Sequence, residues 1–120
     1  MFLIFSKKER TDKYGKEQEE RVYKYLKRKG YEILERNFKC KVGEIDFICE
    51  KDERIIFIEV KSRTNTKFGY GRDAISEERT RHTKNASIHY LKNYVDKKKS
   101  IRYDLIEVLN DEITHLEAIY

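Results

Sequence analysis

GEIDFICEKDERIIFIEVKS, residues 43–62, is the stretch of this chain that decides its fold. Apolar and polar residues alternate from Gly43 to Glu50, which is typical of a β-strand with one buried face. From Arg54 the residues are apolar on both faces until Glu59, which is typical of a strand inside a sheet that is covered on both sides. Because the polar residues 51–53 separate the two runs, the segment predicts an antiparallel hairpin.

A helix and a strand are expected before this hairpin. The helix is predicted over residues 12–29, because apolar residues such as Val22 and Leu26 recur at helical spacing and Gly30 can end the helix. A strand over residues 31–39 then leads into the hairpin.

After the hairpin we expect a loop, a second helix and two further strands. The loop covers residues 65–72, and Ser76 can cap the helix that follows. The last two strands are predicted over residues 101–109 and 112–119. The resulting order, αβββαββ, indicates an α/β fold. The buried stripe of the second helix is expected to consist of Ile88, Leu91 and Val95.

The composition is that of one folded domain over residues 1–120, in which residues 1–11 can form a flexible N-terminal segment. The 27 Lys and Arg outweigh the 22 Asp and Glu, and a formal net charge of +5 is compatible with a nucleic-acid partner. Cys40 and Cys49 lack a Cys-x-x-Cys spacing, which favours buried, reduced thiols over a zinc site. Without a signal peptide or a membrane-spanning run, we expect a cytoplasmic protein with no membrane partner.

Asp46, Glu59 and Lys61 are expected on one face of the hairpin. Glu59 and Lys61 lie two residues apart on one strand, so they point the same way. If the turn consists of Asp52 and Glu53 alone, antiparallel pairing puts Asp46 opposite Glu59. Asp-Glu is an unfavourable sequence for so tight a turn, and a register slip of one residue would separate the three side chains.

Two carboxylates at the ends of apolar strands repel each other unless a cation lies between them. Mg²⁺ suits the position because it takes one or two carboxylates, keeps several waters and bridges to a substrate phosphate. It would polarise a phosphoryl oxygen and lower the pKa of a bound water, while Lys61 would position that water or offset developing charge. Glu19, on the core-facing stripe of the first helix, is expected as a further ligand or a water-mediated contact.

A structural ion pair is the other interpretation of these residues. Patterns of the type Asp-x(n)-Glu-x-Lys arise by chance in a chain in which 41% of residues are charged. A buried pair between one of these carboxylates and Lys61 would leave the same pattern. The residues alone leave both interpretations open.

At these residues the chain resembles the PD-(D/E)xK nucleases, the restriction-endonuclease-like superfamily. Asp46 followed by Glu59-Val60-Lys61 has a spacing similar to that of archaeal Holliday junction resolvases, and the chain is more similar still to the YraN family of bacterial endonuclease-like proteins. Ile45 stands where the superfamily's name has proline. The resemblance covers nearly everything after about Lys13, and it rests on Gly15 with Glu19, residues 30–34 with Asn37, residues 43–46, residues 57–61 with Arg63, Phe68 with Gly69, and residues 102–104.

The resemblance implies a restriction-endonuclease-like fold, with a central mixed sheet flanked by helices. It implies Glu19, Asp46, Glu59 and Lys61 as the catalytic set, with the three carboxylates as ligands of Mg²⁺ or Mn²⁺. DNA, including branched DNA, is the implied substrate. Resolvases work as dimers because a junction has two strands to cut, but no exposed apolar stripe in this sequence indicates an interface, so a homodimer stays open.

Basic and aromatic residues around this site are candidates for DNA contacts. If they share a face, they would neutralise phosphates on either side of the scissile bond without reading sequence, and the aromatic rings could stack on bases. For any one of them alone, a solvated charged surface is the simpler interpretation. The predicted set is Lys61, Arg63, Lys67, Phe68, Tyr70, Arg72, Arg79, Arg81 and Lys84.

Two functions follow from these residues. The first is a metal-dependent endonuclease that hydrolyses DNA phosphodiester bonds. The second is a non-cleaving nucleic-acid-binding or adaptor module that keeps the nuclease fold. The complete set of site residues favours the first, because a fold kept only for binding could lose either carboxylate or the lysine.

Overall fold

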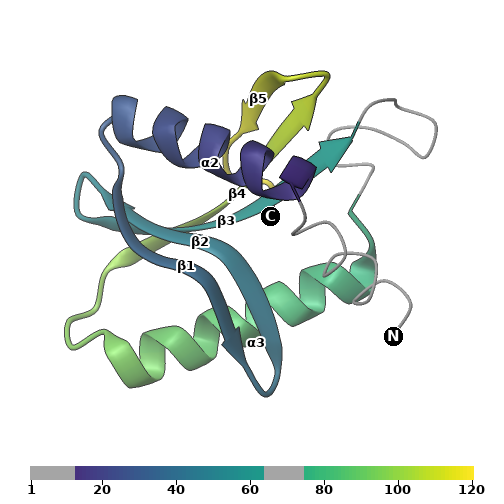
Figure 1. Ribbon diagram of the computed structural model, residues 1–120. Helices are drawn as coiled ribbons and strands as arrows, with labels where there is room; N and C mark the ends of the chain where they lie inside the picture. The colour runs from purple at the N-terminus through teal and green to yellow at the C-terminus, as the bar shows by residue number, and fades with distance from the viewer. Residues whose placement is uncertain (1–12, 64–74) are drawn as a thin grey trace.

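The described part of the chain forms a mixed five-stranded β-sheet with one helix packed on each face (Figure 1). The computed structural model describes residues 13–63 and 75–120. It confirms the α/β class, and within these residues the elements follow one another as α-β-β-β-α-β-β. Along the chain these are α2 (Lys13–Arg28), β1 (Glu32–Cys40), β2 (Gly43–Lys51), β3 (Arg54–Arg63), α3 (Glu77–Tyr94), β4 (Ser100–Leu109) and β5 (Glu112–Leu116).

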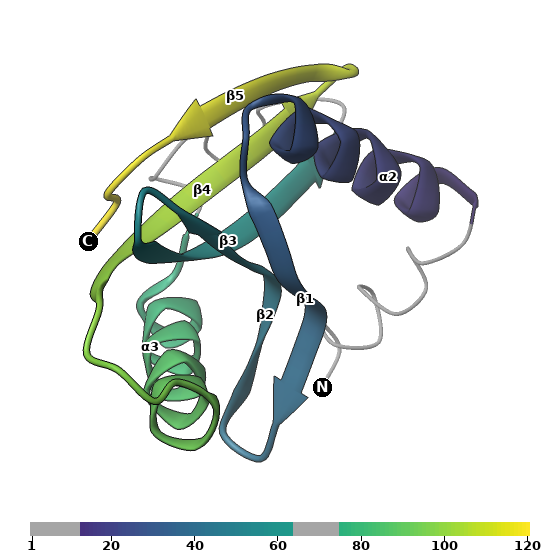
Figure 2. The same cartoon turned by 90° about the vertical axis from the view of Figure 1, so that its left-hand side faces the viewer.

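The strands follow one another across the sheet in sequence order, β1-β2-β3-β4-β5. Among the described strands, only β3 and β4 pair in parallel, and α3 lies between them along the chain. The two helices lie on opposite sides of the twisted sheet (Figure 2). The middle strand β3 is buried from Ile55 to Glu59, as expected for a strand covered on both faces.

The hairpin of β2 and β3 has the predicted register. Phe47 pairs with Ile58, and Lys51 pairs with Arg54 at the turn. Asp52 and Glu53 form that turn with φ angles of 54° and 61°. Positive φ at both central residues is the conformation of a type I′ turn, which matches the twist of the strands. The turn therefore forms despite its unfavourable residues.

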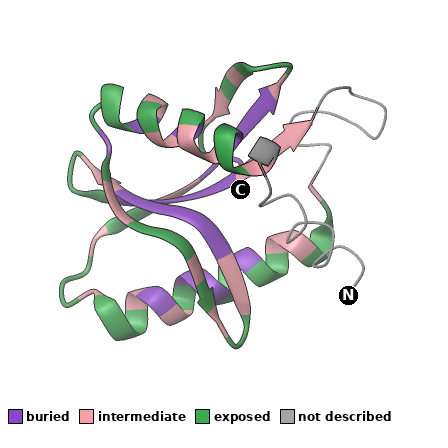
Figure 3. Cartoon of the chain, in the orientation of Figure 1, coloured by how far each residue is buried: buried purple, intermediate pink, exposed green. Residues whose placement is uncertain are grey.

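Helix α2 covers one face of the sheet. Its predicted apolar stripe is confirmed, because Val22 and Leu26 are fully buried against side chains that include Phe47 and Ile58. Gly30, with a φ of +87°, allows the chain to turn away from the helix towards β1. Figure 3 shows the buried residues on the strands and on the helix faces towards them, and the exposed residues on the outside.

Helix α3 covers the opposite face, but with a different stripe from the predicted one. Its buried residues are Thr83, Ala86, Ser87 and Tyr90, whereas Ile88 is 58% exposed and both Leu91 and Val95 are half-buried. The reason is a close approach between α3 and β2 at Gly43. A Cβ atom at Gly43 would lie 2.4 Å from the backbone oxygen of His82, so the helix must turn its small residues towards the sheet.

The last strand is shorter than predicted, because β5 ends at Leu116 rather than near residue 119. Ala118 has a φ of +53°, and its N–H donates to the carboxylate of Asp104 at 3.1 Å. The N–H of Ile119 donates to the backbone oxygen of Tyr103 at 2.8 Å. The buried side chain of Asp104 on β4 thus holds the chain in a conformation that ends β5.

The remaining sequence predictions have mixed outcomes. Both cysteines are free, but only Cys49 is buried and Cys40 is half-buried. Burial raises the pKa of the Cys49 thiol to about 12, with a smaller contribution from the charge of Asp104. The expected loop over residues 65–72 and N-terminal segment over residues 1–11 lie outside the described residues. Within the described part of the chain, no helix combines the length and apolar composition needed to cross a bilayer.

Candidate active site

Asp46 and Glu59 lie on neighbouring strands at the point where the pairing of β2 with β3 ends. Phe47 and Ile58 form the last backbone pair, and beyond them the N–H of Val60 donates to Oδ2 of Asp46 at 2.8 Å. A side chain thus replaces the next backbone partner in the ladder. Asp46 and Glu59 are only 6% and 4% exposed, so both carboxylates are largely removed from water. Two such groups need a nearby positive charge.

Arg79 supplies a positive charge to both carboxylates. Its Nε lies 3.1 Å from Oε2 of Glu59, and its Nη2 lies 3.8 Å from Oδ2 of Asp46. Burial by itself lowers the pKa of Arg79, but the charges of Glu59, Asp46 and Glu44 outweigh burial and raise this pKa above its usual value. The guanidinium therefore stays charged.

The cap of helix α3 fixes where the Arg79 side chain begins. Ser76 caps the helix as predicted, and its Oγ accepts a hydrogen bond from the N–H of Arg79 at 3.0 Å. Arg79 is therefore held in the first helical turn, next to the ends of β2 and β3.

Lys61 follows Glu59 by two residues on β3, so its side chain leaves the same face of the strand. It is half-buried and pairs with Glu107 in the parallel ladder of β3 and β4. Glu107 is buried and forms an ion pair with Arg63. The acidic and basic side chains therefore continue from Asp46 across three adjacent strands to β4.

Glu19 makes its contacts with β1. Its Oε2 accepts a hydrogen bond from Asn37 Nδ2 at 2.6 Å and lies 3.6 Å from Nη2 of Arg36. The side chain of Glu19 is 27% exposed. Of the four predicted catalytic residues, the structure thus brings Asp46, Glu59 and Lys61 to one region, and it directs Glu19 to the edge strand.

The predicted DNA-contacting residues have different surroundings. Arg81 and Lys84 are exposed on the first half of α3, and Lys84 Nζ lies 4.9 Å from the centre of the Tyr120 ring. Arg63 and Arg79 each face a buried carboxylate. The other members of the set, Lys67, Phe68, Tyr70 and Arg72, lie outside the described residues.

The sequence missed the contact of Arg79 with the carboxylates and the position of Glu107. In each case the sequence contains a feature that could have indicated the contact. Arg79 lies in the first turn of a helix, where a positive charge is unfavourable unless anions are close. Glu107 is the one carboxylate within the apolar run Leu105-Ile106-Glu107-Val108-Leu109, and a charge in such a run requires a partner.

Comparison with known proteins gives the family. A model described as uncharacterised protein family UPF0102 matches residues 18–108, a range that contains Asp46, Glu59, Lys61 and Arg79. The chain belongs to the UPF0102 family. This confirms the likeness to YraN proteins that the sequence motifs indicate.

Relatives named as UPF0102 proteins align over most of the chain. The relative from Caldicellulosiruptor saccharolyticus is 42% identical over 78% of this chain and 80% of its own length. The relative from Persephonella marina is 39% identical over 88% of this chain and 91% of its own length. The relative from Fusobacterium nucleatum is 40% identical over 91% of this chain and 92% of its own length.

The carboxylate pair of this UPF0102 chain suits a small divalent cation. Asp46 and Glu59 face one common positive group, the Arg79 guanidinium, so their oxygens are directed at a shared position. Within residues 13–63 and 75–120, no cluster of three or more His, Cys, Asp or Glu side chains forms a ready metal site. Two carboxylates with water and substrate oxygens are a sufficient set for Mg²⁺.

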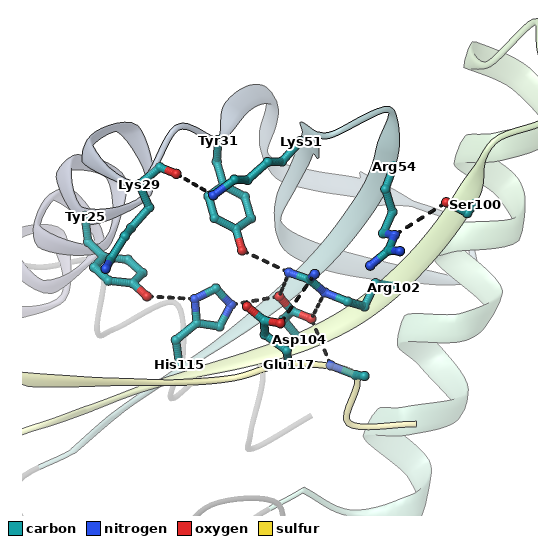
Figure 4. A network of polar contacts seen from close by, with 11 residues as sticks. Tyr25, Lys29, Tyr31, Lys51, Arg54, Ser100, Arg102, Asp104, His115 and Glu117 are labelled. Carbon is teal, nitrogen blue, oxygen red and sulfur yellow. Dashed lines mark hydrogen bonds and ion pairs between the residues drawn. The ribbon is translucent and has the colours of Figure 1, made fainter.

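A second polar network lies on the opposite face of the sheet, beneath α2 (Figure 4). Asp104 on β4 is at its centre. Its carboxylate accepts hydrogen bonds from Arg102 Nε and Nη2, both at 2.8 Å, from His115 Nε2 at 2.7 Å and from the N–H of Ala118. The Tyr31 hydroxyl accepts from Arg102, and the Tyr25 hydroxyl lies 2.8 Å from Nδ1 of His115.

This network has a structural role in this UPF0102 protein. Burial raises the pKa of Asp104, but the hydrogen bonds from His115, Arg102 and Ala118 outweigh burial and hold this pKa below its usual 3.8. All four donors are already directed at one carboxylate. Asp104 therefore joins β4, β5 and the chain beyond β5, whereas the Asp46–Glu59 pair lies on the other face of the sheet.

Proposed function

We propose that this protein is a metal-dependent endonuclease that hydrolyses DNA phosphodiester bonds. One observation carries the proposal: the buried carboxylates of Asp46 and Glu59 both face the Arg79 guanidinium, a single positive group. Lys61 lies on the same face of β3 as Glu59. The mixed sheet with its parallel β3–α3–β4 connection supports the restriction-endonuclease-like fold that the sequence motifs imply.

Asp46 and Glu59 would hold Mg²⁺ or Mn²⁺. When bound, the metal would supply a Lewis acid for a phosphoryl oxygen and a bound water of lowered pKa. The N–H of Val60 fixes the orientation of the Asp46 carboxylate, and burial of both carboxylates strengthens their attraction for a cation. Lys61 would hold the attacking water in place or offset the charge that develops on the phosphate.

Glu19 has a more distant role in this proposal. Asn37 and Arg36 hold its carboxylate against β1, so its contribution to the site would pass through a water molecule. Arg81 and Lys84, which are exposed on α3, would contact phosphates on either side of the scissile bond. Such contacts recognise the backbone rather than the bases, which suits branched or otherwise structured DNA, and cutting both strands of a junction would require a homodimer.

A non-cleaving nucleic-acid-binding or adaptor module is the second candidate function. The observation that favours it is the ion pair of Arg79 with both carboxylates, because this contact neutralises the site without a metal. Under this alternative, Asp46, Glu59 and Arg79 would form a purely structural cluster.

A cleavage assay separates the two functions. Linear, single-stranded and four-way-junction DNA are incubated with the protein in Mg²⁺, in Mn²⁺ or in EDTA. We expect metal-dependent cleavage, and a loss of at least about 100-fold in Asp46→Asn and in Glu59→Gln, because each change removes a charge needed in the transition state. Glu53→Gln, an exposed carboxylate in the hairpin turn, is the matched control and keeps full activity.

Two results would count against the nuclease. Metal-dependent cleavage that survives in both Asp46→Asn and Glu59→Gln would show that the activity arises elsewhere. Firm DNA binding without cleavage of any substrate, in either metal, would support the binding module.

A further inference from the structure

We propose that Arg79 is a built-in competitor of the metal: its guanidinium occupies the position between Asp46 and Glu59 and must leave when a divalent cation binds. This inference rests on the proposed function, because it concerns the same carboxylate pair. It adds a residue that sets how tightly the metal binds.

The geometry of Arg79 is the first support. Its Nε and Nη2 lie 3.1 Å and 3.8 Å from one oxygen each of Glu59 and Asp46. A metal held by the same two oxygens would lie where the guanidinium now is. Two cations at that distance repel each other strongly in a site with little water. The carboxylates can therefore hold the guanidinium or the metal, but not both.

The quality of the contact is the second support. Among the described residues, Nε and Nη2 of Arg79 are buried but make no hydrogen bond of good geometry, although they lie at ion-pair distance from the carboxylates. A buried pair without aligned hydrogen bonds regains only part of its desolvation cost. The carboxylates thus attract the guanidinium, but no well-aligned hydrogen bond to a described residue fixes its position.

The position of Arg79 in helix α3 allows its side chain to move away from the carboxylates. The Ser76 cap fixes its backbone N–H, and its side chain is 25% exposed. The flexible stem can swing towards solvent without movement of the helix. Displacement by a metal therefore needs a change of side-chain rotamer and no rearrangement of the sheet.

Calorimetric titration of the full chain with Mn²⁺, in the absence of DNA, tests the proposal. We expect Arg79→Gln to bind Mn²⁺ at least about tenfold more tightly than the wild type, since a charge-assisted contact of this kind corresponds to roughly that factor. Arg28→Gln removes the same charge from an exposed position at the end of α2 and should leave the affinity within about twofold. Adding Asp46→Asn to Arg79→Gln should abolish the gain.

Each outcome bears on the proposal. If the wild type binds Mn²⁺ and Arg79→Gln binds it equally or more weakly, Arg79 is no competitor, while the proposed metal site stands. If neither protein binds Mn²⁺, both the competitor and the proposed nuclease site are wrong. If only Arg79→Gln binds, the competitor is supported in its strongest form.

A measurement on the wild-type protein covers the case in which Arg79→Gln does not fold. The Nε–H signal of Arg79 and the side-chain carboxyl carbon of Glu59 are followed by nuclear magnetic resonance during titration with Mg²⁺. Displacement requires both signals to shift with one midpoint. A Glu59 signal that shifts while the Arg79 signal stays fixed would overturn the proposal.

Discussion

Asp46 and Asp104 show how differently two buried aspartates can be used in one small protein. Asp104 accepts four hydrogen bonds, including two from Arg102. The Asp46 carboxylate accepts a hydrogen bond from the N–H of Val60 at 2.8 Å and faces Arg79 across 3.8 Å. The Asp104 carboxylate is held by fixed donors of the fold, whereas the Asp46 carboxylate shares the Arg79 guanidinium with Glu59, an arrangement that suits a ligand with positive charge.

The low pKa of Asp104 predicts a specific loss of stability in acid. Because this pKa lies below 3.8 in the folded protein, the ionised carboxylate stabilises the fold above about pH 3.8, and this contribution disappears as the pH falls through the folded-state pKa. Asp104→Asn should therefore lower the free energy of unfolding by roughly 3 kcal/mol at pH 7, since it removes the buried anion that Arg102 and His115 share.

Urea unfolding at several pH values between 7 and 2.5 measures this effect. The difference between the wild type and Asp104→Asn should shrink below pH 3.8. A difference that stays constant down to pH 2.5 would show that the charge of Asp104 does not stabilise the fold.

At the scale of elements, the contact between α3 and β2 decides where the site residues lie. Gly43 lets the backbone of α3 approach β2, and the small side chains of Ala86 and Ser87 fill the interface. This approach also brings the first turn of α3, with Arg79, to the ends of β2 and β3. The packing that buries the helix and the geometry of the carboxylate site therefore have one cause.

Gly43→Ala should disturb both the packing and the site. The added methyl group would meet a backbone oxygen, which cannot rotate away, so α3 must shift. We expect a loss of roughly 2 kcal/mol in the free energy of unfolding, as for other overpacked positions. Unfolding in urea measures the loss, and Val42→Ala, at the exposed neighbouring position, should change stability by less than about 0.5 kcal/mol. Equal stability of Gly43→Ala and the wild type would mean that the interface is looser than described.

At the scale of the whole molecule, the sheet separates a structural network from the proposed active site. The Asp104 network lies beneath α2 (Figure 4), whereas the Asp46–Glu59 pair faces Arg79 of α3. Each face has its own polar cluster, and the apolar residues of β3 lie between them. Changes on one face should therefore leave the properties of the other face intact.

This separation predicts opposite effects for two similar substitutions. Asp46→Asn should abolish metal-dependent cleavage but change the free energy of unfolding by less than about 1 kcal/mol, because the amide oxygen can still accept from Val60. Asp104→Asn should lose stability but cleave DNA at the wild-type rate per folded molecule. Cleavage rates and urea unfolding of both variants check this pattern, and a loss of cleavage in folded Asp104→Asn would show that the two faces are coupled.

Local rules were enough to predict most of the secondary structure and to bring three of the four predicted catalytic residues, Asp46, Glu59 and Lys61, to one region. Alternation along β2 and the uninterrupted apolar run of β3 predicted two strands, and Ser76 predicted the start of α3. The register placed Asp46 near Glu59 because a two-residue turn leaves one way to pair the strands. Each of these follows from contacts between residues close together in the sequence.

The tertiary structure decided what depends on contacts between distant elements. The sequence could not indicate that α3 buries Ala86 rather than Ile88, because the close approach at Gly43 sets that face. Nor could it indicate that Glu19 reaches β1 or that Arg79 lies between the two carboxylates. Periodicity shows which residues share a face of one element, but only the packing of elements against one another determines which charges meet.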